Sequence, residues 1–490
     1  MAPHTFLWHD YETFGLNPRR DRPCQFAGIR TDADLNEIGE PVMIYCQPAN
    51  DYLPDPVSCL ITGITPQLCL ERGLPEYEFA ARIESLLAEP GTIGVGYNTI
   101  RFDDEVTRFM FWRNLVDPYG REWQNDCGRW DLLDVVRMAY ALRPDGIVWP
   151  TKPDERRPDE AGALRPSFKL EDLARANGLL HEAAHDALSD VRATIALARL
   201  IKTAQPKLFD FCLGLHKKDR VAAELGLPAS PQTAQPFLHV SGMFPPERGC
   251  MAVMWPLATH PSNKNEILAW DLAYDPSELP LLDVETIRQR LFSKTADLPE
   301  GVQRLPLKSV HLNKSPMVVR KLQTLSGEMA AKWAIDFEAA LRNAEKAASL
   351  PDMSAIWPEV FKRPKEATPD VDEDLYGGFV GNADRRRLNQ LRALSPAELA
   401  HNRTGFDDDR LGELLFRYRA RNFAETLSPE DAERWAAHRS ARLLEGEGGA
   451  RNVDALLAGI DGLTETADEK GQAVLEALYE YAEMVTPEVS

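Results

Sequence analysis

A strand near the N-terminus constrains the fold of this chain more than any other feature. Residues 6–8, Phe-Leu-Trp, place large apolar side chains on both faces, which is typical of a central strand in a sheet. Asp10 and Glu12 follow two residues apart, so both carboxylates point to the same face. An ionised pair beside a core needs a countercharge. The strand end therefore predicts a divalent-cation site with oxygen ligands.

A second acidic segment follows a short apolar run at 93–97. The chain breaks at Asn98 and is expected to restart as a helix near Asp103. An aspartate at this point can be a metal ligand or a helix cap, and the segment alone leaves both open. We expect Asp104 to cap the helix and Asp103 to face inward as a ligand.

A third segment brings a histidine and an acid to the start of a long predicted helix, residues 187–201. On a continuous helix, residues five apart point about 140° away from each other. If Asp186 is the N-cap, His185 lies on the preceding loop and can turn toward the site, while Asp190 is held one turn inside. This suits a mobile general base beside a fixed metal ligand, because histidine titrates near neutral pH. The alternative is an incidental surface histidine.

The order of the predicted elements indicates a mixed α/β sheet. Apolar runs at 6–12, 24–31 and 44–46 are expected to form an antiparallel meander. Helical and strand-like segments then alternate, at 76–88, 93–97, 104–115 and 132–142, before a helix ending at Gly178 and the long helix. Strands first and alternating elements afterwards predict a mixed sheet rather than a wholly parallel one.

The remainder of the chain has a different pattern, and 490 residues are too many for one ordinary core. Residues 144–166 hold five prolines and no hydrophobic period, so we expect an exposed loop there. Short β-like runs after residue 206 indicate a small barrel with helical additions at 327–349. Amphipathic helices follow the Pro-rich stretch 351–375. We predict three domains: 1–202, 203–350 and 351–490.

The net charge of −20 ordinarily argues against nucleic acid, because Lys and Arg hold a polyanion by releasing its counterions. The charge is uneven, however, since the three predicted domains carry −10, +1 and −11. An acidic protein can bind DNA if its cations line one groove while its carboxylates hold metal elsewhere. Composition therefore leaves the partner open.

The seven cysteines form no Cys-x-x-Cys pair, which predicts reduced thiols rather than a disulfide framework or a zinc knuckle. No run approaches the apolar length of about 18 residues that a membrane-spanning helix needs. The N-terminus has no basic segment followed by an apolar one, so no secretion signal is expected. We expect a cytoplasmic protein with no membrane partner.

Asp10, Glu12, Asp103, His185 and Asp190 together resemble the catalytic set of the DEDDh exonucleases, the histidine-bearing branch with an RNase H-like sheet. The resemblance extends to the bacterial exonuclease I family through several segments between residues 9 and 423. They include His9-Asp10-Tyr11-Glu12-Thr13-Phe14-Gly15, Leu60-Ile61-Thr62-Gly63-Ile64-Thr65-Pro66-Gln67, His239-Val240-Ser241-Gly242-Met243-Phe244 and Tyr418-Arg419-Ala420-Arg421-Asn422-Phe423.

Asp131 falls outside these motifs, and we expect it to cap the helix that follows.

This resemblance implies an RNase H-like exonuclease domain with a mixed sheet, an SH3-like barrel domain with helical additions, and an all-helical C-terminal domain. It implies a metal-dependent 3′ to 5′ exonuclease that degrades single-stranded DNA to nucleoside 5′-monophosphates, in DNA repair and recombination. Two Mg²⁺ ions would be held by Asp10, Glu12, Asp103 and Asp190, and His185 would take the proton from the attacking water.

Single-stranded DNA needs a basic groove with aromatic platforms. Candidate contacts alternate along one segment: Arg417, Tyr418, Arg419, Arg421 and Phe423. The alternative is a solvated helix face with two core aromatics. The resemblance favours DNA contact, in a channel formed by all three domains.

The resemblance further implies that the chain binds the acidic, hydrophobic C-terminal tail of single-stranded DNA-binding protein. Such a tail needs a basic residue for its carboxylate beside an apolar pocket. Arg143 is the candidate for the carboxylate and Phe211 for the pocket wall, with the region of Arg320 as a further candidate. We expect the enzyme to be a monomer.

Two other functions stay open at this point. A DEDDh ribonuclease or a polymerase proofreading exonuclease would use the same five residues, but such enzymes are generally compact, and the segments after residue 202 argue against them. A catalytically inactive single-strand binding module would be favoured by the loss of a carboxylate, and none of the four is lost.

Overall fold

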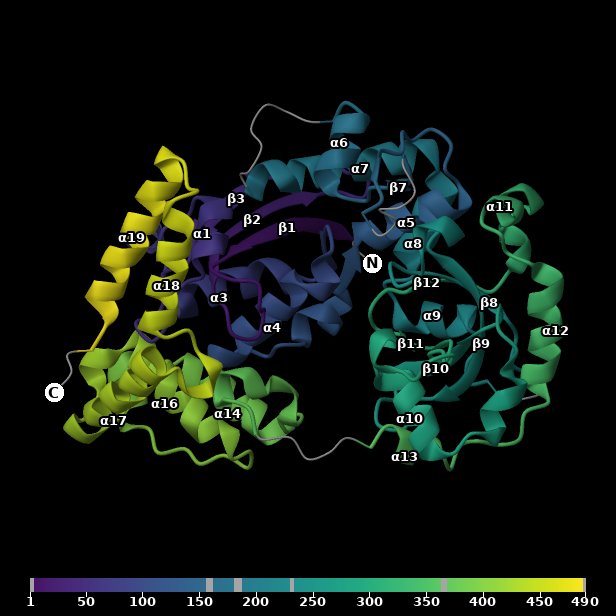
Figure 1. Cartoon of the computed structure of the whole chain (residues 1–490). Helices are drawn as coiled ribbons and strands as arrows, with labels where there is room; N and C mark the ends of the chain where they lie inside the picture. The colour runs from purple at the N-terminus through teal and green to yellow at the C-terminus, as the bar shows by residue number, and fades with distance from the viewer. Residues whose placement is uncertain (1–3, 156–161, 180–186, 230–232, 363–367, 488–490) are drawn as a thin grey trace. The chain divides into compact units, whose positions relative to one another are not determined.

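The computed structural model describes residues 4–155, 162–179, 187–229, 233–362 and 368–487. The chain folds into two compact units (Figure 1). The first comprises Met1–Gly128, His181–Arg192 and Ala367–Ser490, and the second comprises Arg129–Leu180 and Ala193–Glu366.

The first unit is built on a mixed sheet. The strands β1 (Thr5–Thr13), β2 (Pro23–Thr31) and β3 (Val42–Tyr45) form the predicted antiparallel meander. Strand β4 (Thr92–Gly96) pairs in parallel with the other edge of β1. The strand order is β3-β2-β1-β4-β5. The last strand, β5 (Gly128–Asp131), begins at Gly128, where the first stretch of this unit ends. β1 is central, as its apolar faces predict.

The two faces of β1 have different surroundings. Leu7 and Tyr11 are buried in an apolar cluster with residues of the helices α3 and α4. These helices span Glu76–Leu87 and Asp103–Arg113. Asp10 and Glu12 alternate with the buried residues and are only partly buried. The two-residue period of the strand thus brings both carboxylates to the same face, opposite to Leu7 and Tyr11.

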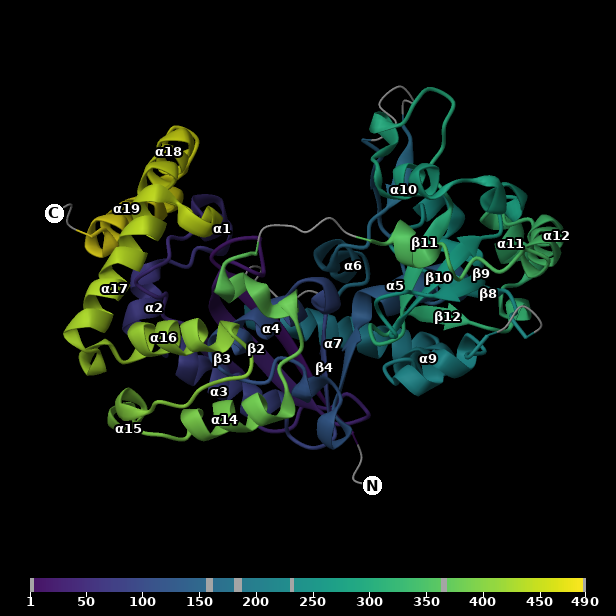
Figure 2. The same ribbon diagram turned by 90° about the horizontal axis from the view of Figure 1, so that it is seen from below.

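Helices from the C-terminal part of the chain complete this unit. Figures 1 and 2 show α18 (Val453–Thr464) and α19 (Glu469–Val485) beside α1 (Pro56–Thr62), and α19 also packs on α2 (Pro66–Arg72). Their apolar side chains form one cluster with Phe14, which follows β1 directly. The C-terminal helices therefore share a core with the end of the central strand.

A second cluster joins the C-terminal region to α4. Phe109 and Trp112 of α4 pack with leucines of the 3₁₀ segment η8 and of the helices that follow it, such as Leu375, Leu388 and Leu411. The elements are η8 (Val371–Gly377), α14 (Asn382–Arg392), α15 (Pro396–His401) and α16 (Arg410–Asn422). The next helix, α17 (Pro429–Ser440), packs on α16. α4 is thus buried between the sheet and the C-terminal region.

The second unit contains a five-stranded antiparallel sheet in the order β11-β10-β9-β8-β12. Its strands are β8 (Phe237–Val240), β9 (Met251–Thr259), β10 (Glu266–Asp271), β11 (Leu307–His311) and β12 (Met317–Val319). Its helices include α5 (Leu132–Leu142), α6 (Leu170–Ala176), α8 (Pro206–Gly214), α9 (Lys218–Glu224), α10 (Val284–Phe292), α11 (Gly327–Lys332), α12 (Phe337–Ala348) and α13 (Trp357–Val360).

The start of α5 confirms one prediction, because Asp131 caps this helix by accepting a hydrogen bond from the backbone N–H of Leu133 (3.0 Å). The long helix α7 (Ala187–Ala204) begins in the first unit and continues into the second.

The stretch 144–166 differs from the expected loop. It contains a short hairpin of β6 (Thr151–Pro153) and β7 (Leu164–Pro166). The hairpin has no hydrophobic period because none of its strand residues is buried, Leu164 included, and its prolines are tolerated at strand ends in a two-stranded sheet.

Among the residues that the structure describes, no helix is both long and apolar enough to cross a membrane.

Candidate active site

The acidic site forms where β4 leaves β1. The pairing of the two strands reaches Trp8, and β4 ends at Gly96. A Cβ at Gly96 would lie 2.6 Å from the backbone oxygen of His9, so this close approach requires glycine. Tyr11 lies on β1, beyond the residues that pair with β4. Its backbone N–H donates a hydrogen bond to Oδ1 of Asp103 (3.1 Å) instead of to a neighbouring strand. The Asp103 carboxylate is thereby fixed against β1.

The first turn of α4 separates the roles of two neighbouring acids. Asp103 is the first residue of the helix, and Phe102 occupies the N-cap position without a side-chain cap. Asp104 is buried and pairs with Arg121 (2.6 Å). The prediction that Asp104 caps the helix is therefore wrong. The helix begins inside the protein, and the Asp104 carboxylate pairs with the buried guanidinium of Arg121 instead.

Three of the predicted metal ligands meet at one point. Asp10 and Glu12 on β1 and Asp190 in the first turn of α7 have carboxylate oxygens that all lie within 4.8 Å of one another. Burial, together with the negative charges of Asp103, Glu12 and Asp190, raises the pKa of Asp10 well above its ordinary value. Carboxylates this close repel each other unless a cation or a proton lies among them, and oxygen donors suit a hard divalent cation. The residues present fit such a metal. His185 lies outside the described residues.

The segment predicted to contact DNA has many partners inside the first unit. Arg417 pairs with Asp370 (2.7 Å) and with Glu413 (2.9 Å). The side chain of Arg421 is 4% exposed and pairs with Asp51 (2.8 Å) and with Asp372. The guanidinium groups of both arginines are therefore engaged with carboxylates.

The remaining residues of this segment are also in contact with the first unit. Tyr418 is buried, and its ring lies 5.8 Å from that of Phe423 and 6.3 Å from that of Tyr77. Arg419 pairs with Asp431 (3.5 Å). These contacts give the segment a structural role. DNA contact by it stays a prediction, which the burial of its side chains does not favour.

The predicted partner residues lie in the second unit. The Nη1 group of Arg143 donates to the backbone oxygens of Leu142 (2.5 Å) and Thr324 (3.0 Å). Phe211 is half-buried, and the guanidinium of Arg220 lies 5.8 Å from its ring centroid.

The further candidate, Arg320, donates from Nε to the side chain of Gln235 (3.1 Å) and from its backbone N–H to Glu224 (3.2 Å).

Sequence reasoning missed two exposed aromatic side chains in the first unit. Tyr376 is 46% exposed and Phe379 is 90% exposed. The guanidinium of Arg19 lies 5.7 Å from the Tyr376 ring, and the Tyr119 ring lies 6.1 Å from that of Phe379. Both belong to a stretch that follows the predicted linker. The sequence signal for this stretch is a pair of aromatic residues on either side of a Gly-Gly pair. Exposed rings of this kind can stack on nucleic-acid bases.

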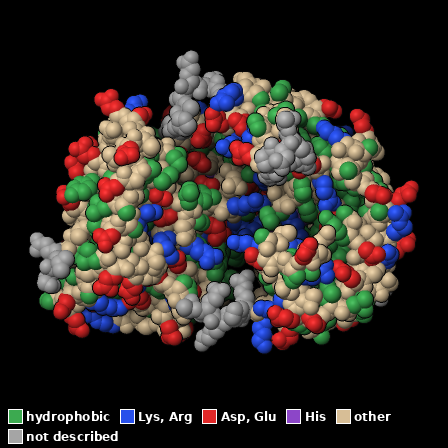
Figure 3. Space-filling model, viewed as in Figure 1, with side chains coloured by type: hydrophobic (Ala, Val, Ile, Leu, Met, Phe, Trp, Pro, Cys, Tyr) green, Lys and Arg blue, Asp and Glu red, His purple; other side chains and the backbone are tan. Residues whose placement is uncertain are grey.

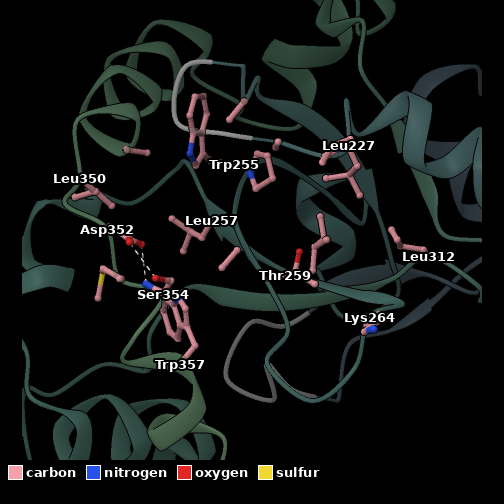
Figure 4. A pocket seen from close by; sticks show the side chains of 18 of the residues that line it. Leu227, Trp255, Leu257, Thr259, Lys264, Leu312, Leu350, Asp352, Ser354 and Trp357 are labelled. Carbon is pink, nitrogen blue, oxygen red and sulfur yellow. Dashed lines mark hydrogen bonds between the residues drawn. The ribbon is translucent and has the colours of Figure 1, made fainter.

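A pocket of about 550 Å³ lies in the second unit (Figure 4). Trp255, Leu257 and Leu350 contribute to its apolar lining. Among its described lining residues, Asp352 supplies the single carboxylate, and it accepts hydrogen bonds from the backbone N–H (2.9 Å) and the hydroxyl (3.0 Å) of Ser354. Clustered acids, which a metal-dependent hydrolase needs, are found at β1 instead.

The surface carries charges of both signs. On the face drawn in Figure 3, Asp and Glu side chains are interspersed with Lys and Arg side chains. The net charge of −20 therefore coexists with basic side chains at the surface.

The mixed sheet and the acids around its central strand define this chain as an RNase H-like exonuclease, and the family comparisons agree. A model described as "Exonuclease" matches residues 7–198. Models of the exonuclease I SH3-like domain and the exonuclease I C-terminal domain match residues 216–363 and 369–485. The chain belongs to the exonuclease I family.

Individual relatives are similar over the whole length. Exodeoxyribonuclease I of Escherichia coli K12 is 44% identical over 488 residues, which cover 98% of each chain. The structure of E. coli exonuclease I with a dA16 oligonucleotide is 43% identical, with a TM-score of 0.88 over 99% of this chain and 100% of that one. A structure of SSB/exonuclease I with the inhibitor CFAM is 42% identical, with a TM-score of 0.87 and the same coverage.

These matches confirm the predicted fold class and the assignment as an enzyme. They extend to residue 485, far beyond a compact ribonuclease or proofreading domain. The boundaries of the three domains stay predictions.

Proposed function

We propose that this chain is a metal-dependent 3′ to 5′ exonuclease that degrades single-stranded DNA to nucleoside 5′-monophosphates in DNA repair and recombination. The observation that carries the proposal is the approach of the Asp10, Glu12 and Asp190 oxygens within 4.8 Å, next to Asp103. The E. coli relative solved with dA16 supports single-stranded DNA as the substrate. A cytoplasmic location and a monomeric state remain predictions.

The proposed ligands are Asp10, Glu12, Asp103 and Asp190, and the proposed metal is a pair of Mg²⁺ ions. When bound, such ions activate a water molecule and stabilise the charge on the leaving oxygen. β1 holds Asp10 and Glu12 on a strand whose other face is buried, so the two carboxylates are well positioned. Tyr11 orients the Asp103 carboxylate through its backbone N–H. We propose that His185 takes the proton from the attacking water.

DNA contacts are proposed at two groups of residues in the first unit. Arg417, Arg419 and Arg421 with Tyr418 and Phe423 remain the candidates from the sequence. The exposed rings of Tyr376 and Phe379 are further candidates for base stacking. Their exposure supports a single-stranded substrate, whose bases are free to stack.

Polarity and strandedness are tested with end-labelled oligonucleotides. We expect a single strand with a free 3′ end to be converted to 5′-mononucleotides in the presence of Mg²⁺. A 3′-blocked strand, a blunt duplex and an EDTA-treated reaction should remain undigested, because the site must hold both metal and an unpaired 3′ end. Products are separated by chromatography. Release of mononucleotides from the 5′ end, or faster digestion of an RNA strand of the same sequence, would contradict the proposal.

We further propose that the chain binds the acidic C-terminal tail of single-stranded DNA-binding protein, with Arg143 at the terminal carboxylate and Phe211 in the pocket wall. The solved SSB/exonuclease I structure supports this class of partner. A guanidinium has five N–H donors, so the carbonyl contacts of the Arg143 Nη1 group fix its orientation and leave donors for a carboxylate.

Arg143→Ala is expected to weaken binding of a tail peptide, because it removes a charge-assisted hydrogen bond worth about 1.5–3 kcal/mol. Fluorescence anisotropy of the labelled peptide measures the change. Digestion of bare DNA should be unchanged, whereas digestion of DNA coated with the binding protein should slow. Arg342→Ala is the matched control, since Arg342 is exposed in the same unit and pairs only loosely with Glu338 (3.8 Å). Equal affinities of wild type and Arg143→Ala would remove Arg143 from the tail site.

A further inference from the structure

A buried ion pair lies next to the acidic site. Nη2 of Arg121 donates to Oδ1 of Asp104 (2.6 Å), and the two side chains are only 1% and 2% exposed. Asp104 follows the proposed ligand Asp103 in the first turn of α4. Arg121 comes from a separate 3₁₀ segment, Gly120–Glu122, which carries none of the proposed ligands. The pair therefore ties the first turn of α4 to another part of the fold.

The guanidinium of Arg121 also lies against the sheet. A Cβ built on Gly94 of β4 would lie 3.5 Å from Nη1 of Arg121 and 3.5 Å from Cε1 of His9 on β1. Arg121 therefore lies next to Gly94 of β4, beside the face of β1 opposite to Asp10. It links the first turn of α4 with the two strands at whose ends the acids meet.

The first turn of α4 has another anchor, on β1. The backbone N–H of Tyr11 donates to Oδ1 of Asp103 (3.1 Å). The hydroxyl of Thr107 donates to the backbone oxygen of Asp103 (2.8 Å) and is hydrogen-bonded to the Tyr11 hydroxyl (3.0 Å). These bonds hold Asp103 itself, whereas the Arg121–Asp104 pair holds the adjacent residue. The two anchors together restrict the rotation of the turn.

We propose that Arg121 is a positioning residue for metal binding: through Asp104 it fixes the first turn of α4 and so keeps the Asp103 carboxylate beside Asp10. This inference rests on the proposed metal-dependent function. A buried guanidinium can instead serve only to neutralise Asp104 in the core, which would be a purely structural role. Metal binding distinguishes the two roles, because only a positioning residue changes it in the folded protein.

The test compares Arg121→Met and Arg121→Lys with wild type. Mn²⁺ binding is measured by calorimetry without DNA, and kcat and KM are measured on single-stranded DNA. For Arg121→Met we expect metal affinity and kcat to fall by about 10- to 100-fold, the range for residues that orient metal ligands, with KM for DNA unchanged. Arg121→Lys should recover part of the metal affinity, because it keeps the positive charge beside Asp104.

Arg113→Met is the matched control. Arg113 lies in the last turn of α4, has a side chain as buried as that of Arg121, and pairs with Glu76 (2.7 Å). Its loss should lower the melting temperature without changing metal affinity. If it weakened metal binding as much as Arg121→Met does, the effect would be a general loosening of α4 and the inference would be wrong.

Wild-type metal affinity and kcat in folded Arg121→Met, whatever its melting temperature, would also overturn the inference. If Arg121→Met does not fold, Arg121→Lys serves as the test. Wild-type metal affinity and wild-type kcat in Arg121→Lys would then contradict the inference. Hydrolysis by the wild-type enzyme without metal would be a different result, since it would remove the proposed function itself.

Discussion

Replacing Asp10 by asparagine is expected to abolish hydrolysis and, at the same time, to raise the melting temperature of the metal-free protein. Asparagine has the same shape as aspartate but lacks the negative charge that a divalent cation needs. The charge is also unfavourable for the fold, because burial and the neighbouring Asp103, Glu12 and Asp190 raise the pKa of Asp10. An acid whose pKa is raised by folding lowers the free energy of unfolding at pH values above the pKa that it has in the unfolded chain.

The pH dependence gives the sign of this effect. As the pH falls through the raised pKa, Asp10 becomes protonated in the folded wild type and the repulsion is relieved. The difference in melting temperature between Asp10→Asn and wild type should therefore be largest at neutral or alkaline pH and shrink in acid. Thermal melts in EDTA at several pH values measure it, and hydrolysis with Mg²⁺ measures the loss of activity.

Metal supplies an internal check on this prediction. Adding Mg²⁺ should raise the melting temperature of the wild type, since a ligand that binds only the folded state stabilises it, and should raise that of Asp10→Asn much less. Glu338→Gln is the control, because this side chain is exposed and distant in sequence from the acids. Near-normal turnover of Asp10→Asn would remove Asp10 from the site. A lower melting temperature in EDTA would show that repulsion among the carboxylates is not the dominant effect.

The acidic site could be predicted from the sequence because its signals are local. The period of two along β1 places Asp10 and Glu12 on one face whatever the rest of the chain does. The break after β4 and the start of α7 likewise indicate strand and helix ends, where Asp103 and Asp190 are expected. What no local pattern shows is the hydrogen bond from Tyr11 to Asp103, because it joins residues 92 positions apart.

The arginines of α16 show a limit of prediction from local sequence patterns. Alternating cations and rings from Phe416 to Phe423 look the same whether the cations meet phosphates or carboxylates. Here the partner of Arg421 is Asp51, which lies 370 residues earlier in the chain. Asp104 is a similar case, since a capping rule that holds for exposed helix ends was overridden by the buried Arg121. Both differences arise from tertiary partners, which composition and spacing do not contain.

Arg421→Met should therefore destabilise the first unit strongly. The arginine lies between Asp51 and Asp372, and its loss leaves two buried carboxylates with less compensation. Removing one partner of a buried ion pair typically costs about 3–5 kcal/mol. Burial alone would raise the pKa of Asp51, but Arg421, together with His438 and Arg442, more than offsets it, and the pKa lies well below the ordinary value. Arg421 likewise lowers the pKa of Asp372 against the effect of burial.

The sign of the pH effect follows from these lowered pKa values. An acid whose pKa is lowered by folding stabilises the folded state above its unfolded pKa, and this stabilisation is lost as the pH falls through the folded pKa. The free energy of unfolding, measured by urea denaturation, should thus differ most between wild type and Arg421→Met near neutral pH. The difference should narrow below about pH 4, where carboxyl groups of the unfolded chain become protonated.

Arg434→Met provides the comparison within the same unit. Arg434 is 54% exposed and pairs with Glu413, and an exposed pair of this kind is worth about 0–1 kcal/mol. We expect its loss to change the free energy of unfolding little at any pH. A stable Arg421→Met variant that binds single-stranded DNA more weakly than wild type would contradict the structural role and return Arg421 to the DNA-binding surface. A variant that unfolds at lower urea concentration, yet binds DNA normally while folded, would place Arg421 in the core that holds the C-terminal helices to the catalytic sheet.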